Sequence, residues 1–416
     1  MYKKTALFIS VFLFHPSANA LTLQEAVDKA LKQSPSVLIR KEKKRLRKEE
    51  KRETIGKSLG KIDAVGSYTK YNLPRTLSPI TPPITPDITT SKIIKSMGIK
   101  YDVMLFSGFS DLRSIEIAKL AQKESEIEFN LTKEELIYNV KSLFFKILTL
   151  KEQKKAALSY KKALSKLYED TKKEVKLGKK AQIDLLKVAS DLENANYGVV
   201  NIENSIKILK SKLASLIGEE KIDKIEKTPY FEKKTPDTDI KETLIYKKAL
   251  LESEKSEKNA QKAKALYYPK LSLNAYYGKN FASGDEKELW QTSVNLNIPI
   301  FDFGNRKSKL QKAKISEIIS KLKLKSTALK LKSDLEEADK NIQNAKEKIK
   351  ALKKQLLFLK KIKETEKIKY QNGVSDMYDL LYAIAKYNKA KSDLISSKYD
   401  LKMKEAYLNY LKAGEK

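Results

Sequence analysis

The sequence predicts a mainly helical chain with an internal two-fold repeat. In this fold, long coiled-coil helices form an α-barrel and four strands per chain contribute to a small membrane β-barrel. Two stretches without glycine or proline, residues 109–177 and 305–372, each predict one continuous helix. At ~1.5 Å per residue each helix is roughly 100 Å long, far longer than a globular core requires. Gly373 follows Gly178 by 195 positions, and this offset defines the repeat.

Residues 1–20 have the pattern of a secretory signal peptide. Lys3 and Lys4 precede an apolar run over residues 5–14, and a small-x-small site ends at Ala20. We therefore expect cleavage after Ala20 and export of the mature chain. The alternative interpretation is a buried N-terminal helix.

Histidine and cysteine are missing from the predicted mature chain. The one histidine, His15, lies in the signal peptide, and the sequence has no cysteine. This composition excludes disulfides, histidine or cysteine metal sites and a histidine-based catalytic triad. No glycine-rich phosphate-binding loop is present either. We expect no catalytic residue, no cofactor and no metal, and export without cysteine fits a bacterial envelope.

The chain is strongly basic, with a formal net charge of +32. A nucleic-acid-binding coiled coil is one interpretation of such a charge. The other is a lysine-rich set of solvated helix faces. Lysine and glutamate alternate along the helices, and an exported chain does not meet nucleic acid, so the second interpretation is favoured.

No apolar run after Phe14 approaches the ~20 residues that a transmembrane helix needs. The longest candidate, residues 143–150, is interrupted by Lys146. If the chain enters a membrane, it does so through β-strands.

The first repeat covers residues 21–218. Thr22 and Glu25 predict a capping box at the start of a helix over residues 21–53, and Pro35 predicts a break within it. The following elements are two strands around residues 62–68 and 99–106, a proline-rich structureless loop over residues 72–91 between them, the first long helix, and a helix over residues 183–217.

The second repeat, residues 240–416, follows an irregular connector over residues 219–239. Its expected elements are a helix over residues 240–266, strands over residues 271–277 and 290–300 with Gly278 and Gly284 in the loop between them, the second long helix, and a helix over residues 377–411. The fourth strand has the clearest alternation of apolar and polar side chains, which is typical of a membrane barrel strand.

The second long helix carries a coiled-coil seam. Apolar residues recur at alternating steps of three and four, and we interpret them as packing positions: Leu335, Ala338, Ile342, Ala345, Ile349, Leu352, Leu356 and Leu359. The helices before and after each strand pair add up to about the length of one long helix, so they can stack end to end beside it. Four strands cannot close a barrel, for which about eight are needed, so several chains must combine.

These motifs resemble those of the TolC-type outer-membrane efflux and secretion channels. The matching sequences are Leu-Thr-Leu-Gln-Glu-Ala at residues 21–26, Leu-Phe-Ser-Gly at 105–108, Pro-Ile-Phe-Asp-Phe-Gly at 299–304, and the Asp-Leu-Leu triplets at 184–186 and 379–381. The resemblance covers residues 21–414. It implies a homotrimer with a twelve-stranded barrel in the bacterial outer membrane and a helical tunnel in the periplasm.

The resemblance also implies two tips that contact a periplasmic adaptor, the membrane fusion protein of an inner-membrane transporter. The tip residues are Leu177, Gly178, Asn372 and Gly373. An ordinary glycine helix cap is the alternative for both glycines. The basic pair at residues 179–180 departs from the family pattern.

A periplasmic aperture narrowed by acidic residues is the third implication. Asp379 matches one acidic position of the family and Asp184 is its repeat-related carboxylate, whereas Tyr382 stands where another acid is expected. Tyr382 would then act as a steric plug. The alternative for both aspartates is a favourable helix N-terminal charge.

The expected function is therefore a passive exit duct of a tripartite efflux or type I secretion system, without enzymatic activity. The alternative is an exported coiled-coil structural or adhesion protein without a pore. The cargo, whether drug, metal ion, siderophore or polypeptide, is not specified by these residues.

Overall fold

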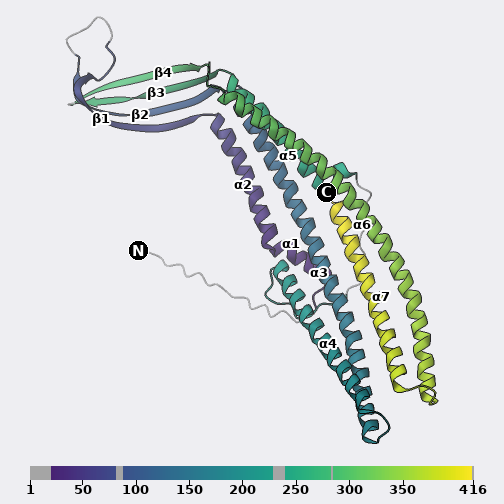
Figure 1. The fold of residues 1–416 in the computed structure, drawn as a ribbon. Helices are drawn as coiled ribbons and strands as arrows, with labels where there is room; N and C mark the ends of the chain where they lie inside the picture. The colour runs from purple at the N-terminus through teal and green to yellow at the C-terminus, as the bar shows by residue number, and fades with distance from the viewer. Residues whose placement is uncertain (1–19, 81–87, 228–238, 283, 415–416) are drawn as a thin grey trace, which may run out of the picture. The chain divides into compact units, whose positions relative to one another are not determined.

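The computed structural model describes residues 20–80, 88–227, 239–282 and 284–414. The predicted signal peptide lies outside these residues except for Ala20, and residues 228–238 of the predicted connector also lie outside them. The helices are α1 (Leu23–Gln33), α2 (Pro35–Ser58), α3 (Ser110–Lys176), α4 (Gln182–Ile217), η1 (Ile240–Glu242), α5 (Leu244–Lys264), η2 (Ala265–Tyr267), α6 (Asn305–Gln371) and α7 (Met377–Leu411). The strands are β1 (Lys61–Thr76), β2 (Thr90–Phe106), β3 (Lys270–Ala282) and β4 (Asp285–Asn297) (Figure 1).

The described chain forms two compact units. We call the unit formed by Ile39–Leu131 and Asp239–Leu331 the sheet unit, and the unit formed by residues 20–38, 132–227 and 332–413 the tip unit. The helices α3 and α6 are each 67 residues long, which confirms both predicted long helices. Among the described residues, no helix is long and apolar enough to cross a membrane.

The predicted start and break of the first helical segment are confirmed. The Glu25 amide donates to the Thr22 hydroxyl at 3.2 Å, and the Thr22 amide donates to the Glu25 carboxylate at 3.0 Å. This reciprocal pair is a capping box, which satisfies free amides at the start of α1. The helix ends at Gln33, and α2 begins at Pro35 because proline is well tolerated in the first helical turn.

The sheet unit contains one antiparallel sheet with strand order β1-β2-β3-β4 (Figure 1). The central pair, β2 and β3, joins the two repeats, so neither strand pair forms a sheet by itself. The apolar face of the whole sheet carries Ile62, Ile99, Tyr101, Val103, Leu273, Tyr277, Trp290, Val294 and Leu296. Its polar face carries Lys61, Asp63, Ser67, Ser96, Lys100, Asp102, Asn274, Ser293 and Asn295.

The first two strands are longer than predicted, and the expectation of a structureless loop over residues 72–91 is wrong at both ends. The strand β1 continues to Thr76, which pairs with Thr90 at the start of β2. The register of this pair shifts between Lys70 and Arg75, and Pro74 lies in this irregularity. Proline lacks an amide donor and is tolerated at a bulge of an edge strand, so it does not end β1.

The second strand pair also differs from the prediction. Gly278 lies inside β3 rather than in a loop, because it pairs with Gly98 of β2 and the Tyr276 ring fills the space that two missing side chains leave. At the other end, β4 stops at Asn297, so Ile298 and Ile300 lie beyond the strand.

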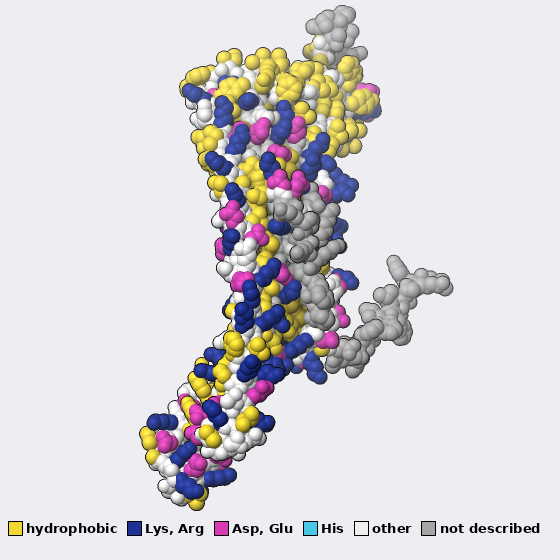
Figure 2. Space-filling model, turned by 90° about the vertical axis from the view of Figure 1, so that its right-hand side faces the viewer, with side chains coloured by type: hydrophobic (Ala, Val, Ile, Leu, Met, Phe, Trp, Pro, Cys, Tyr) yellow, Lys and Arg dark blue, Asp and Glu magenta, His cyan; other side chains and the backbone are white. Residues whose placement is uncertain are grey.

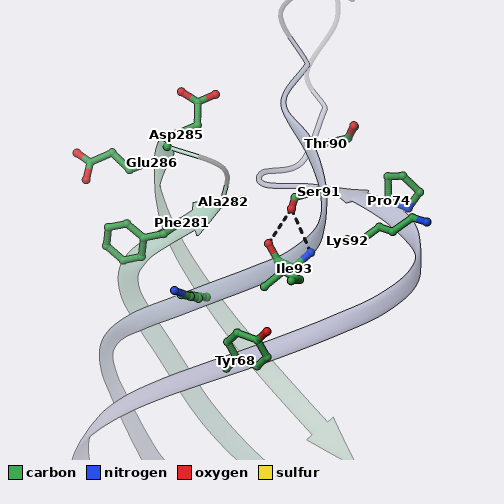
Figure 3. A pocket seen from close by; sticks show the side chains of 12 residues that line it. Tyr68, Pro74, Thr90, Ser91, Lys92, Ile93, Phe281, Ala282, Asp285 and Glu286 are labelled. Carbon is green, nitrogen blue, oxygen red and sulfur yellow. Dashed lines mark hydrogen bonds between the residues drawn. The ribbon is translucent and has the colours of Figure 1, made fainter.

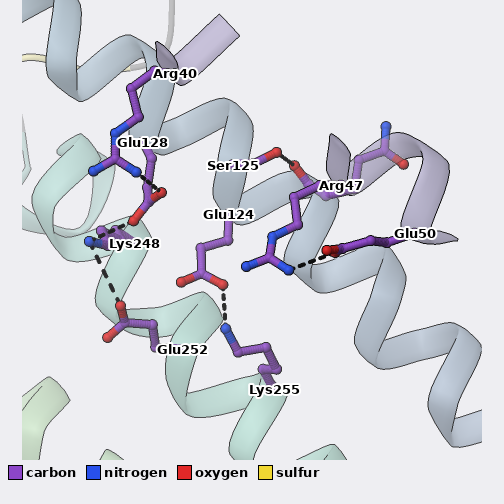
Figure 4. Close-up of polar contacts among 10 residues, drawn as sticks. Arg40, Arg47, Glu50, Glu124, Ser125, Glu128, Lys248, Glu252 and Lys255 are labelled. Atoms are coloured by element: carbon purple, nitrogen blue, oxygen red, sulfur yellow. Dashed lines mark hydrogen bonds and ion pairs between the residues drawn. The ribbon is translucent and has the colours of Figure 1, made fainter. Parts of the chain in front are cut away.

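Ion pairs hold α2 and α5 against α3 in the sheet unit (Figure 4). The Glu128 carboxylate of α3 lies 2.5 Å from the Arg40 guanidinium and 2.9 Å from the Lys248 ammonium. Lys255 of α5 also contacts Glu124 of α3, at 2.5 Å. Burial by itself would raise the pKa of Glu128, but Lys248 and Arg40 outweigh burial and lower this pKa. These contacts connect three helices that sequence order does not place together.

In the tip unit the helices contact one another in the order α4, α3, α7, α6, which places the helix pair of the first repeat beside the helix pair of the second (Figure 1). Lys154 of α3 pairs with Glu203 of α4 at 2.7 Å. The rings of Phe145 in α3 and Tyr399 in α7 stack with centroids 5.9 Å apart. Lys363 of α6 lies 4.3 Å from the ring centroid of Tyr387 in α7. Apart from the contact of α1 with the C-terminal end of α4, the outward edges of the two outer helices, α4 and α6, expose large apolar side chains among the described residues.

The predicted seam of α6 is confirmed by its burial. Ala338, Ile342 and Ala345 are buried, and the other five seam residues are half-buried. By contrast Leu357 and Phe358, which lie off the seam, are exposed. The seam therefore packs inside the chain, whereas a second apolar strip of α6 has no partner among the described residues.

The described part of the connector is fixed to α3 and to Leu21, just before α1. The Leu21 amide donates to the Lys224 carbonyl at 3.0 Å, and Lys151 of α3 donates to the Ile225 carbonyl at 2.8 Å. The Glu152 side chain, only 7% exposed, pairs with Lys155 at 3.0 Å and with Lys227 of the connector. Burial would raise the pKa of Glu152, but the two ammonium groups outweigh burial and lower it.

We expect acid to weaken this attachment of the connector. Because the folded-state pKa of Glu152 is below its ordinary value of 4.5, its ion pairs stabilise the fold above about pH 4.5 and are lost as the pH falls through the folded-state value. Thermal unfolding between pH 7 and pH 3 should show a smaller acid-dependent loss of stability for Glu152→Gln than for the wild type. Glu347→Gln, at an exposed position of α6, is the control and should unfold with the same pH dependence as the wild type. Equal pH dependence in all three proteins would show that Glu152 does not stabilise the connector through its ion pairs.

Candidate functional site at the two helical tips

The first tip is a tight turn between α3 and α4. The Gly178 amide donates to the Val175 carbonyl at 3.0 Å, and the Lys179 amide donates to the Glu174 carbonyl at 2.8 Å. These two bonds form a Schellman motif, in which the residue after the helix adopts the left-handed conformation. Gly178 has φ +69° accordingly. The turn leaves Leu177 at the tip, where the residue is 68% exposed.

The second tip repeats this geometry 195 positions later, between α6 and α7. The Gly373 amide donates to the Tyr370 carbonyl at 3.1 Å, and the Val374 amide donates to the Lys369 carbonyl at 2.8 Å. Gly373 has φ +73°, and Asn372 is exposed beside it. Here Val374 is the exposed apolar side chain, at 75%.

Backbone conformation alone requires glycine at the two tips. A Cβ atom added at Gly178 or Gly373 would meet no other atom within 4 Å. The left-handed conformation costs a residue with a Cβ roughly 1–2 kcal/mol. The turn geometry therefore depends on glycine, while its surroundings are open to a binding partner.

The two tips differ in how the following helix begins. The Asp376 carboxylate accepts a hydrogen bond from the Asp379 amide at 3.0 Å and caps α7. The repeat-related residue before α4 is Ala181, which makes no side-chain cap. A side-chain cap stabilises a helix start by about 1 kcal/mol, so the start of α7 is the better fixed of the two.

We expect Asp376→Ala to loosen the first turn of α7 by about 1 kcal/mol. The reciprocal variant Ala181→Asp should strengthen the first turn of α4 by a similar amount. Amide hydrogen exchange of both turns measures the effect, with faster exchange in the first variant and slower exchange in the second. Unchanged exchange at α7 in Asp376→Ala would show that this cap does not hold the turn.

Beside the second tip, a hollow of about 440 Å³ lies between the end of α6 and the start of α7. It is lined by Leu359, Ile362, Glu366, Lys369, Val374, Ser375, Asp379, Tyr382, Ala383 and Lys386. Asp379 is exposed in the first turn of α7. The Tyr382 ring, 49% exposed, stacks on Tyr378 with centroids 6.2 Å apart and planes 7° apart. The Lys386 ammonium lies 4.4 Å from the centroid of the Tyr382 ring.

Asp184 has a different environment from Asp379. It is half-buried in the first turn of α4, 4.0 Å from Lys187, and is not among the residues that line the hollow. The ammonium of Lys180 at the first tip pairs with Glu174 at 2.9 Å. Glu174 raises the pKa of Lys180, with smaller contributions from the charges of Asp376 and Asp184. The first tip is thus electrostatically linked to Asp376 of the second.

Sequence reasoning missed Asp376, Tyr378 and Lys386. A signal for each exists: Ser-Asp directly before a helix is a capping pattern, and Tyr378, Tyr382 and Lys386 follow one another at intervals of four residues on one helix face. Tyr378 and Lys386 contact the Tyr382 ring, and Asp376 caps the helix that carries it.

A family model described as outer membrane efflux protein matches residues 57–219 and 247–412, one segment in each repeat. Outer membrane protein TolC of Vibrio cholerae is 22% identical over 324 residues, which is 73% of either chain. Among solved structures, a membrane protein from Pseudomonas aeruginosa has a TM-score of 0.81 at 14% identity, covering 94% of this chain and 90% of that one. The outer membrane channel CmeC of Campylobacter jejuni has a TM-score of 0.81 at 16% identity, covering 94% and 85%.

Proposed function

Because the chain belongs to the outer membrane efflux protein family and is an efflux channel of the outer membrane, we propose that it works as a passive exit duct fed by a partner pump. The observation that carries the proposal is the pair of matching glycine turns at the ends of two 67-residue helices. Energy would come from the pump, and this chain would carry out no chemistry. Family membership favours this duct over an exported adhesion protein.

We propose a homotrimer, the assembly of TolC-type channels. The sheet has two open edges, β1 and β4, and three chains joined edge to edge provide twelve strands, enough to close a barrel.

The helical layer of the tip unit also has two uncovered edges. One edge, α4, exposes Tyr197 and Ile208, and the other, α6, exposes Leu357 and Phe358. Contact between the α4 edge of one copy and the α6 edge of the next generates a closed ring.

We propose that Asp379, Tyr382 and Asp184 narrow the periplasmic aperture. The stack of Tyr382 on Tyr378 and the Lys386 cation above its ring support a fixed, bulky constriction beside the exposed carboxylate of Asp379. Asp184 would contribute through its link to Lys180, since it lies outside the hollow. Opening would be a shift between two packed arrangements of these helices.

We propose that Leu177, Gly178, Asn372 and Gly373 contact a periplasmic adaptor that belongs to an inner-membrane transporter. Both turns expose one large apolar side chain, and their glycines leave open space around the backbone. The partner system, efflux pump or type I secretion transporter, depends on the cargo.

The absence of cysteine provides the test of the tip contact. Leu177→Cys and Asn372→Cys introduce unique attachment sites for a short photo-crosslinker, and Lys348→Cys, exposed along α6, is the control. Cross-linking in cells should attach a periplasmic adaptor, identified from its peptides by mass spectrometry, to both tip variants and not to the control. Equal attachment from residue 348, or none from the tips, would refute the proposed contact.

A further inference from the structure

The apolar face of the sheet ends in a cluster of lysines and aromatic rings. The proposed duct function assigns no role to this cluster. Tyr68 of β1, Lys95 of β2 and Phe281 of β3 are paired across the three strands, so they share this face. Lys95 therefore lies between two aromatic side chains. Two residues further along β1, Lys70 pairs with Ile93. We call Tyr68, Lys70, Lys95 and Phe281 the outer rim.

Along the strands, the side chains of this face change abruptly from uncharged to charged. Ile99, Tyr277 and Trp290 form an uncharged row, the next row carries Lys279 and Glu288, and the row after it carries Lys95 and Glu286. An apolar band that ends in aromatic rings and lysines matches the boundary between acyl chains and polar head groups. Figure 2 shows hydrophobic side chains gathered at the sheet end of the molecule.

Two cations of the outer rim remain available to a ligand. The acidic side chains nearby are engaged, since Glu286 pairs with Lys279 at 2.8 Å, Glu288 accepts a hydrogen bond from the Tyr277 hydroxyl, and Asp285 accepts a hydrogen bond from Thr89. Lys70 and Lys95 are exposed and form no ion pair with the described residues. The rim thus keeps positive charge beside aromatic rings.

A hollow of about 880 Å³ adjoins the rim (Figure 3). It is lined by Tyr68, Lys92, Lys95 and Phe281, together with Pro74, Thr90, Ser91, Ile93, Ala282, Gly284, Asp285 and Glu286. This volume is large enough for a phosphorylated sugar head group, and Lys92 adds a third ammonium beside it.

We propose that the outer rim binds the phosphate-bearing head group of a lipid in the outer leaflet of the outer membrane. The inference rests on the proposed function, because the apolar face meets lipid only when the sheet is part of a closed barrel. The ammonium groups of Lys70 and Lys95 would pair with the phosphates, the rings of Tyr68 and Phe281 would lie at the head-group level, and the apolar rows would contact the acyl chains.

The opposite face of the sheet provides a matched control at the same height. There Ser67, Ser96, Asn280 and Lys287 are paired across all four strands. Lys287 is exposed like Lys95, but it has no aromatic neighbour in its row and faces away from the lipid. A lysine at this position should not contribute to lipid binding.

Native mass spectrometry of the purified trimer with diphosphorylated lipid A tests the proposal. Wild type and Lys287→Gln should retain the lipid with the same affinity. A lysine near an anionic lipid surface strengthens binding about fivefold, so Lys70→Gln with Lys95→Gln should weaken it roughly thirty-fold. The same lipid without its phosphates should bind the wild type as weakly as it binds the double variant.

Three results would overturn the proposal: equal affinity of the double variant and wild type, equal binding of the dephosphorylated lipid, or occupancy of the rim by inorganic phosphate alone at the same concentration. Single-channel conductance of the same preparations separates this proposal from the proposed function. A conducting trimer without lipid preference would refute the rim site alone, whereas the lack of any trimer would refute the duct itself.

Discussion

Tyr382→Ala is expected to raise the conductance of the closed channel. The variant loses the stack on Tyr378, worth ~0.5–1.5 kcal/mol, and the contact with the Lys386 cation, worth ~0.5–1 kcal/mol. Both contacts lie within α7 and do not by themselves favour the closed arrangement, so the conductance is expected to rise because the bulky ring beside Asp379 is removed from the hollow. Planar-bilayer recordings of the purified protein measure this directly, and Asp379→Ala should change the conductance in the same direction.

Two control variants make this prediction specific. Tyr382→Phe keeps the ring and should behave as the wild type, because stacking and the cation contact do not need the hydroxyl. Lys348→Ala changes an exposed position of α6 that does not line the hollow, and should have little effect. Unchanged conductance in Tyr382→Ala and Asp379→Ala would show that the aperture lies elsewhere.

Tyr197→Asp is expected to prevent assembly. Tyr197 is 71% exposed on the uncovered edge of α4, where the proposed ring places a second copy. An unpaired carboxylate buried in that contact costs about 3–5 kcal/mol, and the ring repeats the cost at each interface. Size-exclusion chromatography with light scattering in detergent should show monomers at concentrations at which the wild type is a trimer.

The control for this variant is Ser165→Asp, which adds the same charge to an exposed position of α3. The helix α3 lies between α4 and α7, so its free surface is not an edge of the layer. This variant should assemble normally. A trimeric Tyr197→Asp protein would contradict the proposed contact between copies.

Local sequence signals were sufficient for the helices. The absence of glycine and proline predicts both long helices, and Gly178 and Gly373 predict their ends because a left-handed residue follows a helix at little cost only when it is glycine. The Thr22 capping box and the break at Pro35 are equally local. The family model confirms the two repeats, with one matched segment in each.

The ends of the strands and the order of the helices depend on contacts between distant residues. Pro74 and Gly278 indicate loops in isolation, but β2 pairs with the residues on either side of Pro74 and with Gly278 itself, so both residues lie within strands. Likewise, α7 of the second repeat packs against α3 of the first through Phe145 and Tyr399. No local pattern specifies these partners. For the candidate site, the family resemblance suggested Asp379 and Tyr382, and the structure adds that the Tyr382 ring stacks on Tyr378.

The central claim, a duct built from several copies of this chain, is tested most directly by measuring the mass and the conductance of the purified mature protein in detergent. The account predicts a mass of three chains and discrete single-channel conductance after transfer to a lipid bilayer. A monomer that stays in solution without detergent and produces no conductance would contradict it.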